Sequence, residues 1–463
     1  MSLLQELRSV VGEQWVITTE ERRLYSLDGF TVAGRDPEAV VLPENEEEAV
    51  KVVKTLLMRG EPFVVRGTGT SLSGASIPIN GEVVVSMSRL NRVLSLEGME
   101  ITVGPGIANI MVTKNAPPDV FYAPDPSSYS VSSIGGNVSH DSGGIHVVKY
   151  GPTFNHVVGL RVMLTNGEVI DVGGRSVMDD AGIFVGAEGT LGVVLRARLR
   201  LTPRPATTLT LMGTFDSLRD AGQAVINTYQ RGVVPAAMEM MDRNSIEAVE
   251  RSKFKTGYPR AEAIILVELD GYGAQVEEEI RRTEAAFNEA GGRVITARSQ
   301  EEADKLWRGR KGAFPAMGAV SPAYLTLDNN ILITKLPEVL EQISKISERY
   351  SVKVANVFHA GDGNLHPLVP YDPQDPENLR RALHAAREIA KVAVESGGVP
   401  SGEHGIGVEK IGFMGFYYSE EDLEAMRRVK KVFDRSRILN KCKMLRLEGC
   451  EPVGQLRTLW EGD

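Results

Sequence analysis

The chain has 463 residues, of which 52 are basic and 61 acidic, so its formal net charge is −9. Its 42% apolar and 24% charged residues are ordinary for a globular protein and exclude a disordered or fibrous chain. The negative net charge argues against a nucleic-acid-binding surface.

No stretch reaches the roughly 18 uncharged apolar residues of a membrane-spanning helix. Residues 1–8 also lack the basic and apolar regions of a signal peptide. We therefore expect a cytoplasmic protein, or one attached peripherally to a membrane redox complex. The two cysteines, Cys442 and Cys450, are too few for a disulfide framework or a four-thiolate iron–sulfur site, and we expect ordinary thiols.

Short apolar runs alternate with turns through the first two hundred residues. Residues 39–43 predict a strand, Asn45 predicts the N-cap of a helix that begins with three glutamates, and residues 62–66 predict a second strand. Further strands are expected at 83–85, 101–103 and 158–164. The stretch between 104 and 151 is rich in Gly, Pro and Ser, which is typical of backbone that wraps around a ligand.

Longer elements alternate after Pro205. Strands are predicted near 208–214 and 263–269, and helices near 217–231, 274–290 and 336–350. This pattern indicates an α+β arrangement with the helices on one face of a sheet. From Glu420 onward we expect one amphipathic helix and then an irregular tail.

Residues 66–74, RGTGTSLSG, predict a phosphate-binding loop. Glycines let successive amides point into one concavity, and the hydroxyls add donors. A nicotinamide-type fingerprint would need a third glycine where Leu72 stands and a helix directly after it, so that class of site is disfavoured. The alternative is a plain Gly/Ser turn between strands.

Five further segments follow this loop in a fixed order: 124–128 (PDPSS), 132–138 (SSIGGNV), 141–144 (DSGG), 149–151 (KYG) and 186–194 (GAEGTLGVV). Together they resemble the FAD-binding domain of the vanillyl-alcohol oxidase (PCMH-type) flavoprotein superfamily. The branch is that of the FAD-binding subunit of glycolate oxidase and the D-lactate and D-2-hydroxyglutarate dehydrogenases, and the resemblance runs from about residue 37 to 444.

This resemblance implies an α+β protein with three parts. Residues 1–205 would form a PCMH-type FAD-binding domain of two α/β subdomains. Residues 206–418 would form a substrate-binding cap, an antiparallel sheet covered by helices that carries a metal site. Residues 419–463 would return to the FAD domain.

The resemblance also implies which residues hold FAD. The pyrophosphate would lie on the loop, and other segments would line the rest of the dinucleotide: Arg66, Gly67, Thr68, Gly69, Thr70, Ser71, Leu72, Pro124, Asp125, Ser133, Gly136, Asn137, Gly143, Glu188, Gly192, Val193 and Asn440. Members with covalent flavin typically carry a histidine in this loop. None lies between Arg66 and Gly74, so we expect non-covalent FAD.

Three of the seven histidines lie in two short glycine-rich segments. In residues 358–367, Asp362-Gly363 is a favoured centre for a two-residue hairpin turn, which would place His359 directly opposite His366. Opposed side chains lie about 5 Å apart, a separation that suits two ligands of one metal ion. The alternative for each histidine alone is a hydrogen-bonded structural role, and that is the role we expect for His140, His146, His156 and His384.

The second segment, residues 401–407, has glycines on both sides of Glu403-His404, so that one side chain can bind a metal while the other acts as a base. The same branch has a divalent metal held by two histidines and a glutamate. The resemblance therefore implies His359, His366 and Glu403 as ligands of zinc, manganese or iron, and His404 as the catalytic base.

Arg310 lies in a basic turn, residues 306–314, and the resemblance places it at the carboxylate-binding position. Arg308 and Lys311 are expected to be solvated. Two departures from the family pattern concern the substrate and the flavin: Ile333 stands where a second arginine is usual, and Lys441-Cys442 replaces a Pro-Gly pair after Asn440.

The sequence thus indicates an FAD- and metal-dependent dehydrogenase of a small D-2-hydroxy acid, D-lactate or glycolate, that passes electrons to an electron-transfer flavoprotein, an iron–sulfur subunit or a quinone system. Two alternatives stay open. One is a flavoenzyme of the same fold with another substrate, such as an ether-phospholipid synthase or a sugar oxidase. The other is a non-catalytic FAD subunit that relays electrons. Which acid, metal and acceptor are used, the oligomeric state and the role of the tail 445–463 are not legible in the sequence.

Overall fold

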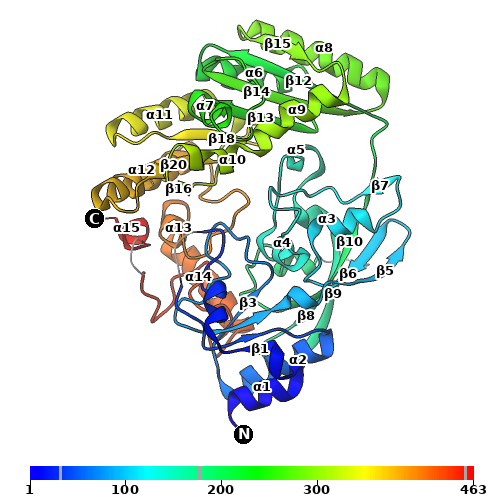
Figure 1. Ribbon diagram of the computed structural model, residues 1–463, viewed down its shortest axis with the longest axis vertical. Coiled ribbons are helices and arrows are strands. Elements are labelled where there is room, and N and C mark those ends of the chain that lie inside the picture. The colour runs from blue at the N-terminus through cyan, green and yellow to red at the C-terminus, as the bar shows by residue number, and fades with distance from the viewer. Residues whose placement is uncertain (31–33, 175–178, 453–455, 463) are drawn as a thin grey trace. The chain divides into compact units, whose positions relative to one another are not determined.

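The computed structural model describes residues 1–30, 34–174, 179–452 and 456–462 (Figure 1). The chain folds into two compact units, neither of which is one continuous stretch. The first comprises Met1–Gly144, Gly151–Arg204 and Glu403–Leu456. The second comprises Ile145–Tyr150, Pro205–Gly402 and Arg457–Asp463. None of the described helices combines the length and the hydropathy that a bilayer crossing needs.

The first unit begins with a mixed four-stranded sheet and two helices. The strand order is β1 (Val16–Ile17), β2 (Val40–Val41), β4 (Val83–Ser86) and β3 (Phe63–Arg66), with β4 parallel to both of its neighbours. Helices α1 (Leu3–Val11) and α2 (Glu46–Arg59) bury their apolar residues in the same core as these strands. The predicted N-cap is confirmed, because Asn45 Oδ1 accepts from the Glu48 amide.

A second sheet of the first unit is antiparallel, in the order β5 (Val93–Glu97), β6 (Glu100–Val103), β10 (Val193–Arg200), β8 (Val157–Met163) and β9 (Val169–Gly173). Helix α4 (Ile134–His140) packs on it through Ile134 and Val138, which lie four residues apart on one helix face. Smaller elements complete this part: α3 (Asn109–Lys114), β7 (Val120–Phe121) and β11 (Thr202–Pro203). Helices α13 (Met414–Tyr417) and α14 (Glu420–Phe433) follow in its C-terminal segment.

The second unit is built on one large, mostly antiparallel sheet. Its main order is β15 (Arg293–Thr296), β12 (Thr207–Phe215), β14 (Ala263–Gly271), β13 (Ala237–Asp242), β18 (Ala355–His359), β19 (Asn364–Leu365) and β17 (Asn329–Asn330). Strand β20 (Pro367–Tyr371) pairs with β18 and with β16 (Ala323–Thr326).

Helices cover both faces of this sheet, so the expectation of helices on one face is wrong. On one face, Phe287 of α8 (Gly273–Glu289) fills the space where Gly213 has no side chain. On the other, the indole of Trp307 in α9 (Gln300–Lys311) donates to Thr210 Oγ1 at 3.1 Å. Residues 210 and 213 point to opposite faces because side chains alternate along a strand.

The remaining described helices of the second unit are α5 (Val147–Tyr150), α6 (Leu218–Gln230), α7 (Arg243–Glu250), α10 (Ala313–Ala316), α11 (Leu336–Arg349), α12 (Pro376–Glu395) and, apart from its first residue, α15 (Leu456–Glu461). Helix α5 interrupts the first unit in sequence. Lys149 and Tyr150 tie it to β14 through the buried carboxylate of Asp270, to which the Tyr150 hydroxyl donates at 2.5 Å.

Cys442 and Cys450 form a disulfide, so the expectation of ordinary thiols is wrong. Their Cα atoms lie 5.5 Å apart although the two residues are eight positions apart in sequence. Positive φ at Asn440 and Cys442 leads into this turn, and Met444 and Gly449, also with positive φ, lie within it. No local motif in the sequence indicates such a turn.

Candidate functional site

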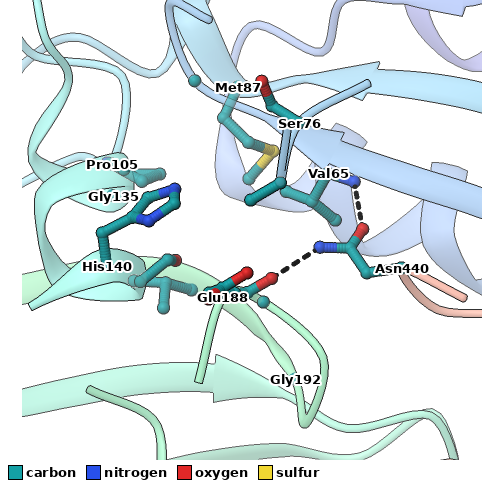
Figure 2. A pocket seen from close by; sticks show the side chains of 15 residues that line it. Val65, Ser76, Met87, Pro105, Gly135, His140, Glu188, Gly192 and Asn440 are labelled. Carbon is teal, nitrogen blue, oxygen red and sulfur yellow. Dashed lines mark hydrogen bonds between the residues drawn. The ribbon is translucent and has the colours of Figure 1, made fainter. Parts of the chain in front are cut away.

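A pocket in the first unit brings together five of the positions expected to hold FAD (Figure 2). It encloses about 540 Å³ of empty space, open solvent at its mouth included. The five are Gly67, Gly136, Glu188, Gly192 and Asn440. The other lining residues are Val65, Ala75, Ser76, Met87, Pro105, Gly135, Ser139, His140, Gly189 and Val194.

Glycines form much of this wall because neighbouring atoms leave no room for side chains. A Cβ on Gly67 would lie 2.0 Å from Ser133 Oγ, and one on Gly192 would lie 2.5 Å from Val162 Cγ1. Ser133 is also the N-cap of α4, since its Oγ accepts from the Gly136 amide at 3.3 Å. The backbone of the phosphate loop therefore lies against the Ser133 side chain at the start of α4. This close approach fits a dinucleotide held against main-chain groups.

Asn440 connects three segments of the pocket wall. Its Oδ1 accepts from the Val65 amide at 2.9 Å, and its Nδ2 donates to the Glu188 carbonyl at 2.7 Å, as the dashed lines in Figure 2 show. Its left-handed backbone, φ 44°, begins the turn that leads to Cys442. Lys441-Cys442, which replaces the usual Pro-Gly pair, therefore does not move the Asn440 side chain out of the pocket wall.

The carboxylate of Glu188 holds the loop that follows His404. Its Oε1 accepts from the Ile406 amide at 2.6 Å, and its Oε2 accepts from the Gly407 amide at 2.8 Å. A further hydrogen bond runs from the Ser73 hydroxyl to the His404 carbonyl at 3.0 Å. The histidine expected to act as base is therefore anchored to the unit that contains the glycine-lined pocket.

Arg66 lies against the phosphate loop rather than in the pocket wall. Its Nη1 donates to the Ser76 carbonyl at 3.4 Å, and a Cβ on Gly69 would touch its Nη2. Burial raises the pKa of nearby Asp28 to about 6, although the Arg66 charge acts in the opposite direction. A cation and a titratable carboxyl are thus buried beside the loop, and no motif in the sequence pointed to Asp28.

Twelve of the seventeen expected positions lie outside the wall of this pocket: Arg66, Thr68, Gly69, Thr70, Ser71, Leu72, Pro124, Asp125, Ser133, Asn137, Gly143 and Val193. Asn137 belongs to a buried hydrogen-bond network, in which its Oδ1 accepts from Asn109 Nδ2 at 3.0 Å. His140, expected to be structural, lines the pocket at the end of α4. His140 could have been predicted as a pocket residue, because it lies on the same helix as Gly136.

In the second unit, His359 and His366 lie close together, but not through the predicted turn. Strand β18 pairs with β19 in the register His359 to Asn364, so four residues form the turn and the two-residue hairpin is wrong. His366 lies two residues beyond Asn364 and hence on the same face. The ring centroids are 5.0 Å apart with their planes at 89°.

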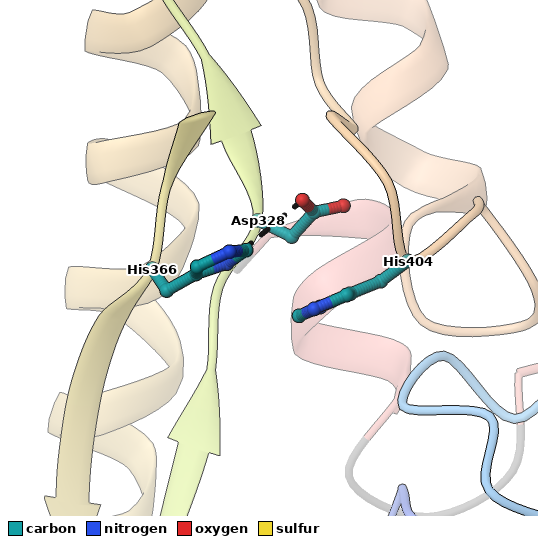
Figure 3. Close-up of side chains that lie close together, drawn as sticks. All are labelled: Asp328, His366 and His404. Carbon is teal, nitrogen blue, oxygen red and sulfur yellow. Dashed lines mark ion pairs between the residues drawn. The ribbon is translucent and has the colours of Figure 1, made fainter. Parts of the chain in front are cut away.

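Both imidazoles are oriented by acceptors at Nδ1. His359 Nδ1 lies 2.7 Å from Glu239 Oε1, and His366 Nδ1 lies 3.3 Å from the Leu327 carbonyl. A carbonyl and an ionised carboxylate only accept, so each Nδ1 carries the proton and each Nε2 carries the lone pair. Figure 3 also shows the ion pair between His366 and the buried Asp328, 3.9 Å from Nδ1 to Oδ1. Rings that are oriented through Nδ1 and direct Nε2 outward suit a divalent metal, because Nε2 is then the ligand atom.

Arg310 is buried, with its side chain 3% exposed, and its Nη2 lies 2.5 Å from Glu239 Oε2. Arg308 and Lys311 on the same helix are exposed, as expected. The N-cap of this helix is Ser299, whose Oγ accepts from the Glu302 amide at 3.2 Å. Of the three basic residues in this turn, Arg310 alone shares a buried carboxylate with His359.

The chain passes from the second unit to the first between Gly402 and Glu403. Before this point, Ser401 and the Gly402 amide both donate to Asp328 Oδ2, at 2.7 and 3.1 Å. After it, Glu403 and His404 belong to the first unit, where His404 Nε2 lies 3.7 Å from Glu403 Oε1. Because Asp328 also pairs with His366, the segment that leads into Glu403 is tied to the carboxylate beside that ring.

Comparison with known proteins places the chain in a family. Residues 37–173 match the family described as "FAD binding domain", and residues 204–444 match "FAD linked oxidases, C-terminal domain". The chain is 38% identical to "Glycolate oxidase subunit GlcD" of Escherichia coli strain K12, over 98% of this chain and 93% of that protein. It is 28% identical to "D-lactate dehydrogenase [cytochrome], mitochondrial" of Arabidopsis thaliana, over 96% of this chain and 80% of that protein.

The fold is similar to that of p-cresol methylhydroxylase, whose structure was solved with substrate bound. The TM-score is 0.79 at 16% sequence identity, and 97% of each chain is covered. The chain therefore belongs to the FAD-linked oxidase family and is an FAD-dependent oxidoreductase with a PCMH-type fold. The resemblance inferred from the sequence motifs is confirmed.

Proposed function

We propose that this protein oxidises a small D-2-hydroxy acid, glycolate or D-lactate, to the 2-oxo acid, with the help of a divalent metal. The observation that carries this proposal is the pair His359 and His366, each oriented through Nδ1. The names of the relatives, a glycolate oxidase subunit and a D-lactate dehydrogenase, support the substrate class.

The metal would be held by His359, His366 and Glu403, a set of two nitrogens and one carboxylate that zinc, manganese and iron all accept. FAD, held without a covalent bond, supplies a two-electron acceptor when bound, and the cation supplies a Lewis acid. The remaining chemistry falls to the side chains of the protein.

His404 would take the proton of the substrate hydroxyl as general base. The anchoring of its backbone by Ser73 and of the following amides by Glu188 supports this role, because a base must be held within hydrogen-bond reach of the proton. Arg310 would orient the substrate carboxylate. Its ion pair with Glu239 involves Nη2 alone and leaves N–H groups of the planar fork for a second carboxylate.

A small substrate is favoured over a diacid. Ile333, which stands where the family usually has a second arginine, opens a short helix at Ile333–Lys335 and brings no charge there. A second carboxylate, as in 2-hydroxyglutarate, would find no cation at this position. We therefore expect turnover to fall with the length and charge of the acid.

The electrons would leave through a separate redox protein or a quinone. Both cysteines of the chain are consumed by the Cys442–Cys450 disulfide, so no thiolate is left for an iron–sulfur cluster. The name of the bacterial relative, a subunit, supports a multi-subunit context. An electron-transfer flavoprotein, an iron–sulfur subunit and a quinone system are the acceptor classes to test.

Two other functions are testable against this one: a same-fold flavoenzyme that acts on another substrate, and a non-catalytic FAD subunit. The experiment mixes the protein anaerobically with glycolate, D-lactate, L-lactate or D-2-hydroxyglutarate. Reduction of the bound flavin is measured as the loss of its visible absorbance. We expect bleaching by glycolate or D-lactate that a chelator abolishes. Bleaching that survives complete metal removal would contradict the metal-dependent mechanism, and no bleaching by any hydroxy acid would contradict the substrate class.

A further inference from the structure

We propose that Glu239 is a positioning residue that orients both the metal ligand His359 and the carboxylate-binding Arg310. The proposal rests on the proposed function, because it assigns Glu239 a role in the same metal and substrate site. Neither the motifs nor the comparisons point to this residue.

The sheet register fixes the first contact. Strands β13 and β18 are antiparallel neighbours, and Glu239 lies directly opposite His359. Opposed side chains on one face lie about 5 Å apart at Cβ, so the carboxylate reaches the ring without distortion of the backbone. The resulting distance from Glu239 Oε1 to His359 Nδ1 is 2.7 Å.

The second contact uses the other carboxylate oxygen. Arg310 reaches Glu239 Oε2 from the C-terminal turn of α9, at 2.5 Å from Nη2. The three side chains are nearly inaccessible to solvent: Glu239 is 0%, Arg310 3% and His359 5% exposed. A fully buried carboxylate is costly unless it is paired. Here Oε1 is within hydrogen-bond distance of His359 Nδ1, and Oε2 forms an ion pair with Arg310 Nη2 that lacks hydrogen-bond geometry.

This arrangement couples the two functional groups. A carboxylate at Nδ1 keeps that nitrogen protonated and presents Nε2, on the opposite edge of the ring, as the ligand atom. The same carboxylate balances the buried charge of Arg310 and holds its Nη2 end by charge attraction. The loss of Glu239 should therefore weaken metal binding and substrate binding together, while an ordinary buried ion pair would affect only stability.

The test compares Glu239→Gln and Glu239→Leu with the wild-type holoenzyme. Each protein is stripped of metal with a chelator while FAD is retained, and the dissociation constants for Mn²⁺ and Zn²⁺ are measured by calorimetry. Gln keeps an acceptor for the Nδ1 proton, whereas Leu has none, so we expect graded weakening that reaches about 10- to 100-fold for Leu. KM for the hydroxy acid should rise in parallel, because Arg310 loses its partner.

Asp242→Asn is the matched control. Asp242 lies on the same strand, is 6% exposed, and accepts from the Asn356 amide at 2.8 Å and from the Ser245 amide at 2.9 Å. Residues 239 and 242 point to opposite faces of the sheet. Asp242→Asn should lower the melting temperature but leave both metal dissociation constants unchanged.

A single change at Glu239 leaves Arg310 as an unpaired buried charge, which can prevent folding. The double variant Glu239→Gln/Arg310→Met removes both charges with little change in volume, and we expect it to fold and still to bind metal more weakly. Metal affinity equal to wild type in the folded variants would overturn the role of Glu239, and so would an equal loss of affinity in Asp242→Asn. A wild-type protein that binds neither ion would instead overturn the proposed metal site itself, and the role of Glu239 with it.

Discussion

Glu188 accepts hydrogen bonds from Gly407 with both carboxylate oxygens, at 3.1 Å to Oε1 and 2.8 Å to Oε2. Oε1 also accepts from the Ile406 amide. One buried side chain of the pocket wall thus determines where the backbone runs three residues after His404. The relationship makes Glu188 a structural link between the proposed flavin site and the proposed base.

We expect Glu188→Gln to lower kcat/KM about 10- to 100-fold, because it removes charged acceptors worth about 1.5–3 kcal/mol each. The side-chain NH₂ of Gln would replace one carboxylate oxygen, and this donor would face backbone N–H groups that are also donors. Steady-state kinetics and a titration of the apoprotein with FAD are the measurements. Weaker FAD binding with an unchanged kcat at saturating flavin would show that Glu188 acts only through the cofactor.

His404→Ala should reduce kcat by about 10²- to 10⁴-fold, the contribution typical of a general base, while the FAD content stays that of wild type. The control is His384→Ala. That ring lies on α12, outside the predicted site segments 358–367 and 401–407, and stacks on Tyr350 with 6.3 Å between the ring centroids. Equal kcat values for the His404 variant and the wild type would refute the role of His404.

Gly67→Ala should abolish FAD binding, because the new methyl group would overlap Ser133 Oγ at 2.0 Å. The ratio of flavin to protein absorbance after purification measures the effect. Adding Ser133→Ala removes the nearest atom and should recover part of the flavin. Gly415→Ala is the control, since a methyl group there would meet no neighbouring atom within 4 Å, and flavin content should not change.

Lys443 should make the protein more stable as the pH rises above 8. Burial lowers the pKa of Lys443 to about 8 from 10.5, so between these values the unfolded chain binds more protons than the folded one. Stability attributable to this group therefore rises with pH across that window, by about 3 kcal/mol at 1.36 kcal/mol per unit. Denaturant titrations of wild type and Lys443→Met at pH 7.5 and 10 measure the difference. A stability gap between the two proteins that does not change with pH would contradict the prediction.

The Cys442–Cys450 disulfide should stabilise the first unit by about 2–3 kcal/mol, the value expected for closure of a loop of this length. We expect Cys442→Ser/Cys450→Ser, and wild type treated with a thiol reductant, to unfold at the same lowered denaturant concentration. Reductant that further destabilises the double serine variant would show that its effect on the wild type is not due to this bond.

Local signals in the sequence predicted the elements well. Asn45 and the glutamates after it mark the start of α2, and three of the glycine-rich segments contribute Gly67, Gly136 and Gly192 to the pocket wall. These features depend on nearby residues, such as a side chain that caps the amide three positions later. Predictions of this kind do not require knowledge of the tertiary fold.

Long-range partners were not predictable. Glu239 is 120 residues from His359, and in the sequence it is a single charged residue in an apolar strand. Similarly, no residue near Asp328 in the sequence indicates a contact with Ser401. The prediction for the turn between His359 and His366 was also wrong. Asp362-Gly363 favours a two-residue turn. In the folded sheet, β19 pairs with β17 as well as with β18, and this second partner helps to set its register. Such choices are decided by the assembled sheet rather than by the local sequence.

Each of the two units is built from separate segments of the chain, which has a practical consequence for attempts to isolate either one. A fragment that stops at residue 204 would carry the glycine-lined wall but lack Asn440 and the amides that satisfy Glu188. Removal of residues 145–150 would likewise strip α5 from the sheet of the other unit. Truncation at the boundary between the two matched family regions should therefore yield insoluble, colourless protein, and intact polypeptide is required for reconstitution with cofactor.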